Sequence, residues 1–253
     1  MKDPHSTPDP PLLAPHPVLP RYYRRAEERS GFVRHLFDRT AGDYDRIEGL
    51  IGFGRGSKYR RQALLRAGLQ PGMHLLDVAT GTGLVAREAL AVVGDAGVVI
   101  GLDPSAVMMR SGHHTLALQL VQGNAERLPF ADAQFDFVSL GFALRHLADL
   151  YGVFREFHRV LRPRGVVCVL EITPPRSAWG RGLLKFFLRG AVPLLSRALA
   201  RHADTPLLFR YFWDTIEACA PPPQVLEALQ FAGFATVRRH VEARVFSEYT
   251  ARR

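Results

Sequence analysis

Short apolar runs alternate with stretches of helical periodicity through the middle of this chain. The runs are rich in Val and Leu and cover residues 73–79, 97–103, 118–122, 135–142 and 165–172. Residues 84–92, 105–113 and 149–161, which lie between them, are helical in pattern. Continuous apolar strands are typical of a parallel sheet covered on both faces, and strand–helix alternation indicates a doubly wound sheet. The pattern therefore predicts an α/β fold with a mostly parallel, doubly wound sheet; two further strands predicted near the C-terminus bring the expected number to seven.

The N-terminal part predicts a tail and two helices. Residues 1–20 hold seven of the 18 prolines, a composition that predicts a disordered tail. From Gly31 the apolar positions of residues 32–37 follow helical spacing, and a second helix is predicted at 58–67. Residues 21–253 are then expected to form a single domain, with N-terminal helices over 21–70.

The C-terminal part predicts an insertion and the edge of the sheet. Residues 174–213 are helical in pattern and too long for an ordinary strand connection, so we expect a helical cap inserted after the fifth strand. Residues 214–253 should hold a helix at 223–232 and two strands, at 234–240 and 242–249. These strands are predicted to be an antiparallel pair at the sheet edge.

Charge and cysteine content narrow the classes of protein. The formal net charge is +9, yet residues 61–171 balance ten basic against ten acidic side chains, so the excess lies on the flanks. Two cysteines, Cys168 and Cys219, are too few for a disulfide framework, a zinc ribbon or an iron–sulfur cluster, and no metal is expected. No secretory signal and no apolar run of roughly 18 residues is present, so we expect a cytoplasmic protein.

Polar and glycine-rich segments follow three successive predicted strands. Asp77-Val78-Ala79-Thr80-Gly81-Thr82-Gly83 ends the first strand, and such a turn lets backbone N–H groups approach a ligand. The third glycine of a dinucleotide fingerprint and the Gly-Lys of a P-loop are both missing. Asp103 ends the second strand, where a carboxylate can accept both hydroxyls of a ribose, and residues 123–130 form a polar turn after the third. Open α/β sheets bind ligands at these strand ends, although a tight turn with solvated acids is the alternative.

The motifs resemble those of class I S-adenosylmethionine-dependent methyltransferases. The resemblance rests on residues 77–83, 101–103, 124–130 and 135–136. More narrowly, the chain is similar to the ubiquinone/menaquinone-biosynthesis C-methyltransferase family from about Val33 to the C-terminus. Segments 144–145, 159–163 and 232–234 carry this narrower likeness, together with Phe37 and Tyr44-Asp45. It implies a Rossmann-like fold with a cofactor-binding core over 71–173.

The resemblance also implies S-adenosylmethionine as cofactor and a site for it. Asp103 would hold the ribose and Asn124-Ala125 the adenine edge, while Thr82 and the backbone of Gly81 and Gly83 hold the methionine end. Tyr44 would close over the cofactor, and Met108 would form an apolar wall. The other residues expected at this site are Asp77, Ala79, Thr80, Pro104, Glu126, Gly141 and Phe142. Gly141 replaces a serine usual in the family, so only its backbone could contribute.

Two further departures from the family bear on the chemistry. The family has an acidic residue after the glycine loop and an Arg-Asn pair after the fourth strand, where this chain has Leu84 and Arg145-His146. Methylation of a quinol ring needs a hydroxyl deprotonated by a base or a positioned water. Leu84 cannot orient a water, whereas His146 has the pKa of a general base, and Arg145 could hold the oxygen. The alternative for His146 is a capping or solvent-facing histidine.

The predicted cap carries much of the excess positive charge, and several partners are compatible with it. No acidic residue occurs from Ile172 to Ala203, and Arg181, Lys185 and Arg189 form one basic stripe. The cap is either a lid over the substrate pocket or a lid that also touches a membrane surface through 176–201, or it is neither. The leading function is methyl transfer to a small aromatic or quinol-like molecule in quinone biosynthesis or a secondary-metabolite pathway, with a homodimer left open.

Two other functions compete with this one. The net charge suggests a nucleic-acid methyltransferase, but the motifs for base methylation are missing and the aromatics do not interleave with the basic stripe, so no nucleic-acid partner is expected. The second alternative is an S-adenosylmethionine-binding protein of this fold with non-methylating chemistry.

Overall fold

The computed structural model describes residues 12–51, 55–112, 118–194 and 202–253. Its sheet has seven strands in the order β3-β2-β1-β4-β5-β7-β6. The strands are β1 (His74–Val78), β2 (Val98–Asp103), β3 (Gln119–Gln122), β4 (Phe135–Gly141), β5 (Leu161–Ile172), β6 (Ala235–Glu242) and β7 (Phe246–Arg252). The first five strands pair in parallel, and β7 is antiparallel to both β5 and β6. The predicted doubly wound sheet and its antiparallel edge pair are confirmed.

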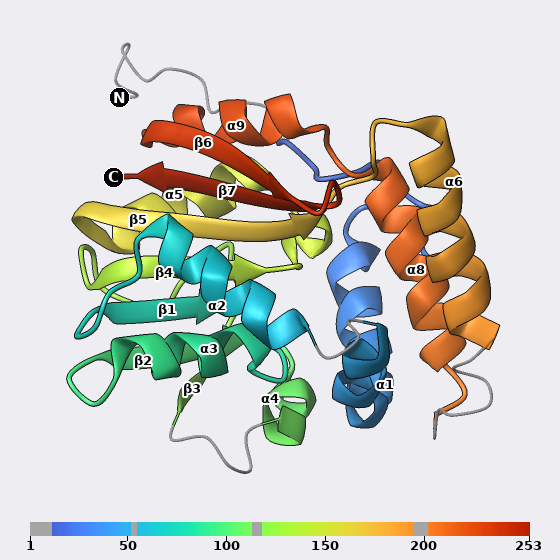
Figure 1. Cartoon of the computed structure of the whole chain (residues 1–253), viewed down its shortest axis with the longest axis horizontal. Helices are drawn as coiled ribbons and strands as arrows, with labels where there is room; N and C mark the ends of the chain where they lie inside the picture. Colours follow the sequence, from blue (N-terminus) through green and yellow to red (C-terminus); the bar gives the residue numbers. More distant parts are fainter. Residues whose placement is uncertain (1–11, 52–54, 113–117, 195–201) are drawn as a thin grey trace, which may run out of the picture.

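Helices cover both faces of the sheet, as Figure 1 shows. The helices before and within the core are α1 (Glu28–Ile51), α2 (Gly56–Ala67), α3 (Leu84–Val93), α4 (Ala106–Gly112), the 3-10 turn η1 (Leu144–His146) and α5 (Leu150–Val160). Those after β5 are α6 (Ala178–Phe186), the π-helical turn η2 (Phe187–Ala191), α8 (Thr205–Ala218) and α9 (Pro222–Phe231).

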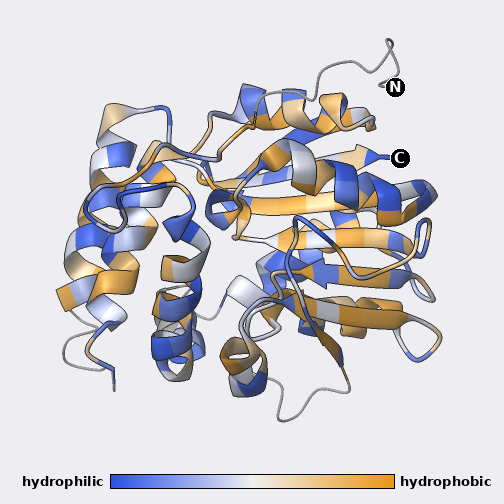
Figure 2. Ribbon diagram, turned by 180° about the vertical axis from the view of Figure 1, so that it is seen from behind, coloured by the Kyte–Doolittle hydropathy of each residue, from blue (hydrophilic) through white to orange (hydrophobic). Residues whose placement is uncertain are grey.

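Alternation along the strands builds two hydrophobic cores. Leu75 of β1 faces α2 and α3, where it packs with Leu64, while the next residue, Leu76, faces α5 and α9. Successive strand residues point to opposite faces, and both faces are apolar because both are covered. Figure 2 shows the resulting hydrophobic band along the strands.

Helix α5 illustrates how local sequence fixes an element. Its buried residues are Leu150, Val153, Phe154, Phe157 and Val160, a spacing that gives one continuous apolar face. Asp149 caps the helix, because its carboxylate accepts the backbone N–H groups of Tyr151 (3.2 Å) and Gly152 (2.8 Å). The cap thus satisfies two of the backbone N–H groups that the first turn of α5 leaves without a helical partner.

The expected disordered tail is wrong for residues 12–20, and residues 1–11 lie outside the described part of the chain. The backbone of Leu13 bonds with Asp149 and Leu150, each at 2.9 Å. The Pro15 carbonyl accepts from Ala220 N at 2.6 Å. Burial lowers the pKa of His16 to about 4. Proline content predicted disorder, but prolines without N–H groups still offer carbonyls and apolar rings for packing.

The chain changes winding direction between β1 and β4, which lie side by side at the centre of the sheet. Open α/β sheets bind ligands outside the carboxyl ends of strands at such a point. Helix α1 stands across this edge, with α8 and then α6 beyond it (Figure 1).

Candidate active site

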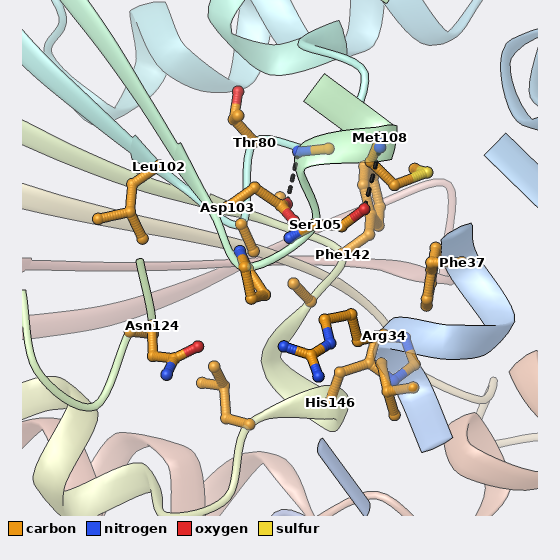
Figure 3. A pocket seen from close by; sticks show the side chains of 18 of the residues that line it. Arg34, Phe37, Thr80, Leu102, Asp103, Ser105, Met108, Asn124, Phe142 and His146 are labelled. Carbon is orange, nitrogen blue, oxygen red and sulfur yellow. Dashed lines mark hydrogen bonds between the residues drawn. The ribbon is translucent and has the colours of Figure 1, made fainter. Parts of the chain in front are cut away.

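A cavity of about 480 Å³ lies at the carboxyl ends of the central strands (Figure 3). In Figure 3, Asn124 and Leu102 lie on one side, Phe37 of α1 lies on the opposite side, and Asp103 and Ser105 lie between them. The residues expected at the cofactor site that line it are Tyr44, Asp77, Ala79, Thr80, Gly81, Thr82, Asp103, Pro104, Met108, Asn124, Ala125, Glu126, Gly141 and Phe142. The cavity thus gathers segments that lie far apart in the sequence.

The glycine loop is bonded to the end of β2. The Gly81 N–H donates to Asp103 Oδ2 at 2.8 Å, and the Ser105 N–H donates to Asp103 Oδ1 at 2.8 Å. The expectation that the loop directs free N–H groups at a ligand is therefore wrong for Gly81. Gly83 is not among the lining residues; with φ of +82°, it is instead the N-cap residue of α3.

Asp77 organises this loop from below. Its carboxylate accepts from Thr80 Oγ1 at 2.8 Å and from Ser139 Oγ at 2.6 Å. Burial raises the pKa of Asp77 to about 6 and also raises the pKa of Asp103 to about 6. Hydrogen bonds to the two carboxylates oppose both shifts. Above pH 6 both groups are mostly ionised, so the cavity wall carries the carboxylates of Asp77 and Asp103.

Two of the non-glycine residues with positive φ lie at the same edge. Ala79 follows β1 with φ of +53°, and Phe142 follows β4 with φ of +60°. Residues with a Cβ adopt this region at a cost of about 1–3 kcal/mol, and they do so mainly at functional sites. Both residues line the cavity.

Gly141 has a packing reason to differ from the family's serine. A Cβ at this position would lie 2.5 Å from Val85 Cγ2, which is shorter than the contact distance allowed between two carbon atoms. Val85 is buried on α3, so it has little room to move. The glycine therefore matches the neighbouring valine, and only its backbone faces the cavity.

Helix α1 closes the cavity through contacts that were not expected. Asp38 accepts from Ser105 Oγ, and Asp45 accepts from Thr82 Oγ1. The two acids lie seven residues apart and so on one helix face. This spacing is the feature of the sequence from which their shared role could have been predicted. Arg34 and Tyr44 also line the cavity. Together these residues tie α1 to the loops after β1 and β2.

His146 reaches the cavity from η1 and sits among aromatic rings. Its ring stacks on Tyr211 (centroids 5.5 Å, 19°) and meets the edge of Phe37 (5.4 Å). Both ring nitrogens are buried without a hydrogen-bond partner among the described residues. Burial holds the pKa of His146 well below its usual range, and nearby Arg145, His16 and Arg29 add to the effect. The imidazole is therefore neutral at pH 7, with a ring nitrogen able to accept a hydrogen bond.

Arg145 does not line the cavity, so the expectation that it holds a substrate oxygen is not supported by its position. Its guanidinium is buried, pairs with Glu171 of β5 and donates to the Phe142 carbonyl at 2.8 Å. It also lies 5.1 Å from the ring centroid of Phe212. Adjacent residues of a 3-10 turn point about 120° apart, which separates Arg145 from His146. Arg145 acts as a positioning residue for the strained turn after β4.

Removing this guanidinium should destabilise the fold strongly. We expect Arg145→Ala to lower the free energy of unfolding by about 3–5 kcal/mol, because it leaves the carboxylate of Glu171 buried and unpaired. Adding Glu171→Gln should recover much of the loss. Urea unfolding of the two variants and the parent measures both effects. Equal stability of Arg145→Ala and the parent would contradict the assignment.

The expected lid role of the cap is also not supported. None of the described residues of 174–213 lines the cavity, and residues 195–201 lie outside the described part. Instead, Tyr211 and Phe212 of α8 support His146 and Phe37 from behind. The basic stripe also differs from expectation, because Lys185 pairs with Glu217 (3.2 Å) and Arg189 lies 3.7 Å from Asp214.

Comparisons with known proteins agree with this architecture. Residues 24–245 match the model of the ubiE/COQ5 methyltransferase family. The chain is 34% identical to a demethylmenaquinone methyltransferase of Geobacillus kaustophilus, over 85% of this chain and 92% of that protein. It is 28% identical to the ubiquinone/menaquinone biosynthesis C-methyltransferase UbiE of Coxiella burnetii, over 85% and 87%.

Among solved structures, a SAM-dependent methyltransferase from Aquifex aeolicus superposes with a TM-score of 0.60 at 18% identity, covering 82% of this chain and 97% of that one. This likeness supports the fold. Because the family match spans most of its length, this chain belongs to the ubiE/COQ5 methyltransferase family and is a methyltransferase.

Proposed function

We propose that this chain transfers a methyl group from S-adenosylmethionine to a ring carbon of a small quinol-type molecule, with His146 as the base on the substrate side. One observation carries the proposal. One cavity brings the glycine loop, Asp103 and Asn124 together with a buried imidazole that has no hydrogen-bond partner in the described part of the chain. Relatives that match over most of their length are named for methylating demethylmenaquinone and for C-methylation in quinone biosynthesis.

The residues present suit this cofactor. Asp103 is ionised above pH 6 and would accept the ribose hydroxyls, while the Asn124 amide and the Ala125 backbone would contact the adenine edge. Met108 is buried against the loop and gives an apolar wall: a Cβ on Gly81 would lie 3.5 Å from Met108 Cε. When bound, S-adenosylmethionine supplies an electrophilic methyl group on its sulfonium.

The substrate end of the cavity favours proton transfer in a dry environment. Phe37, Tyr211 and Phe212 surround the His146 ring and exclude water from it. A neutral imidazole takes the proton from the quinol hydroxyl, which raises the electron density on the ring carbon. After the carbon–methyl bond has formed and the sulfur–methyl bond has broken, the ring carbon loses its own proton to solvent. The oxygen then regains a proton from the imidazolium, which restores the aromatic quinol and the neutral base. Deprotonation and alignment are the two tasks left to the protein, since methyl transfer itself is an in-line displacement.

The test is incubation with methyl-labelled S-adenosylmethionine and a panel of demethylated quinols and phenols, with products identified by mass. The expected result is label in a quinol. Label in RNA alone would support the nucleic-acid alternative, and binding of the cofactor without transfer to any compound would support non-methylating chemistry. Either outcome would overturn the proposal.

A further inference from the structure

Helix α6 presents a row of large apolar side chains to solvent. Trp179, Leu183 and Phe186 are 90%, 66% and 70% exposed, and no residue of this helix is buried. The spacing i, i+4, i+7 places the three on one face. Single exposed hydrophobic residues are ordinary, but a contiguous patch of this kind usually marks an interaction site.

The row is not needed to hold the cap together. The opposite side of the α6–η2 segment packs on α8, where Leu184 and Leu188 contact Trp213 and Ile216. In Figure 1, α6 is the outermost helix of the cap, on the side of α8 away from the sheet. The exposed row therefore serves neither the core nor the cavity.

The charges near this row select its partner. Arg176 and Arg181 are exposed and make no ion pair among the described residues, whereas Lys185 and Arg189 are committed to acids of α8. No acidic residue occurs from Ile172 to Ala203. Arg181 lies on the helix side opposite the apolar row, and Arg176 precedes the helix. An apolar, aromatic face on a segment that carries two exposed guanidinium groups and no acid matches a surface with anionic headgroups above hydrocarbon.

A second copy of this chain fits the face less well. A two-fold contact sets the same patch against itself, and this segment offers no acid that could pair with Arg176 of the second copy. Three large side chains also form a small part of the roughly 800 Å² per partner that stable dimers bury. None of the described helices is long and apolar enough to cross a bilayer, which limits the contact to the interface.

We propose that α6 is an interfacial membrane anchor that inserts Trp179, Leu183 and Phe186 into an anionic lipid surface while the charges of Arg176 and Arg181 attract lipid phosphates. The helix lies in the membrane plane with its α8-facing side toward the protein. The anchor works independently of the chemistry in the cavity, so its test does not rest on the proposed methyl transfer.

The experiment is flotation of the full chain with vesicles of equimolar phosphatidylcholine and phosphatidylglycerol, and with vesicles of phosphatidylcholine alone. The parent should float with the anionic vesicles and release at high salt. Trp179→Ser/Leu183→Ser/Phe186→Ser should bind at least about 30-fold more weakly, since the apolar transfer is lost. Arg176→Gln/Arg181→Gln should lose about fivefold per charge on anionic vesicles only.

A matched control and a spectroscopic signal distinguish a specific loss of membrane binding from an effect of misfolding. Phe231→Ser removes a 54% exposed aromatic on α9 and should leave binding unchanged. The chain has two tryptophans, and Trp213 is already buried. Any blue shift of emission with vesicles therefore comes from Trp179 and should vanish in Trp179→Phe. Methyl transfer to a water-soluble, short-chain quinol should be the same in the triple variant and the parent.

Three results would overturn the anchor. The first is a parent that binds neither vesicle type, and the second is a triple variant that binds as well as the parent. The third is a parent dimer in sedimentation equilibrium that the triple variant converts to monomers without any vesicle binding, which would make the face a subunit interface. Equal binding to both vesicle types would remove the role of the arginines.

Discussion

Replacing Asp103 with asparagine is expected to weaken binding of S-adenosylhomocysteine by at least about 100-fold. Asp103 contributes the buried carboxylate at the end of β2, and a charge-assisted hydrogen bond contributes about 1.5–3 kcal/mol. Two ribose hydroxyls would lose this acceptor. Isothermal titration measures the affinity, and Asp95→Asn, an exposed residue outside the cavity, is the control.

The same carboxylate predicts a pH dependence. Because burial raises the pKa of Asp103 to about 6, the acceptor is complete above pH 6 and is lost as the pH falls through that value. Affinity should be constant from pH 7 to 8 and decline below pH 6. Asp103→Asn should flatten this decline, leaving only the part due to Asp77, whose pKa is also about 6. An unchanged affinity in Asp103→Asn would place the ribose elsewhere.

Replacing His146 with asparagine is expected to lower turnover by about 10²- to 10⁴-fold, the usual contribution of a general base. Asparagine is the residue that the family resemblance gives for this position, but the family's acid after the glycine loop is Leu84 here. The amide therefore has no acid to help it position a water. Cofactor affinity should change by less than about threefold, since His146 is expected at the substrate side of the cavity. His35→Asn on the exposed side of α1 is the control.

The pH profile gives an independent readout of His146. Burial lowers the pKa of His146 well below 6.5. The base is therefore neutral at pH 6.5 and above, and turnover should not depend on its protonation in that range. Turnover should fall only at more acid pH, and this acid limb should disappear in His146→Asn. Turnover equal to that of the parent across the range would exclude His146 as the base.

The sheet could be predicted well because each strand is recognisable from its own run of consecutive apolar residues. Leu75-Leu76 and Val166-Val167 are apolar on both faces, a pattern that only a doubly covered sheet requires. The strand ends follow from the glycine loop and Asp103. The position of the cavity then follows from strand order, without further information.

Side-chain direction outside the sheet could not be predicted in the same way. Helix α6 has apolar residues on two faces, and only the presence of α8 decides that Leu184 turns inward while Trp179 stays exposed. Arg145 and His146 are neighbours in sequence, yet the 3-10 turn sends one to Glu171 and the other to the cavity. The direction of these side chains depends on contacts with distant segments, which the periodicity of the sequence does not reveal.

The N-terminal segment shows a related limit. Pro15 and His16 lie in a proline-rich stretch that reads as disordered, but their carbonyls accept from Ala220 and from Arg29. These partners lie 13 to about 200 residues away in the chain, so local composition cannot reveal them.

We propose that one cavity serves both the methyl donor and a quinol, with His146 at the quinol end. The most direct measurement is the position of the transferred methyl group, found by NMR of the product formed from methyl-labelled S-adenosylmethionine and a demethylated quinol. We expect label on a ring carbon with the parent and almost none with His146→Asn. Label on a quinol oxygen, or on RNA with no quinol modified, would contradict it.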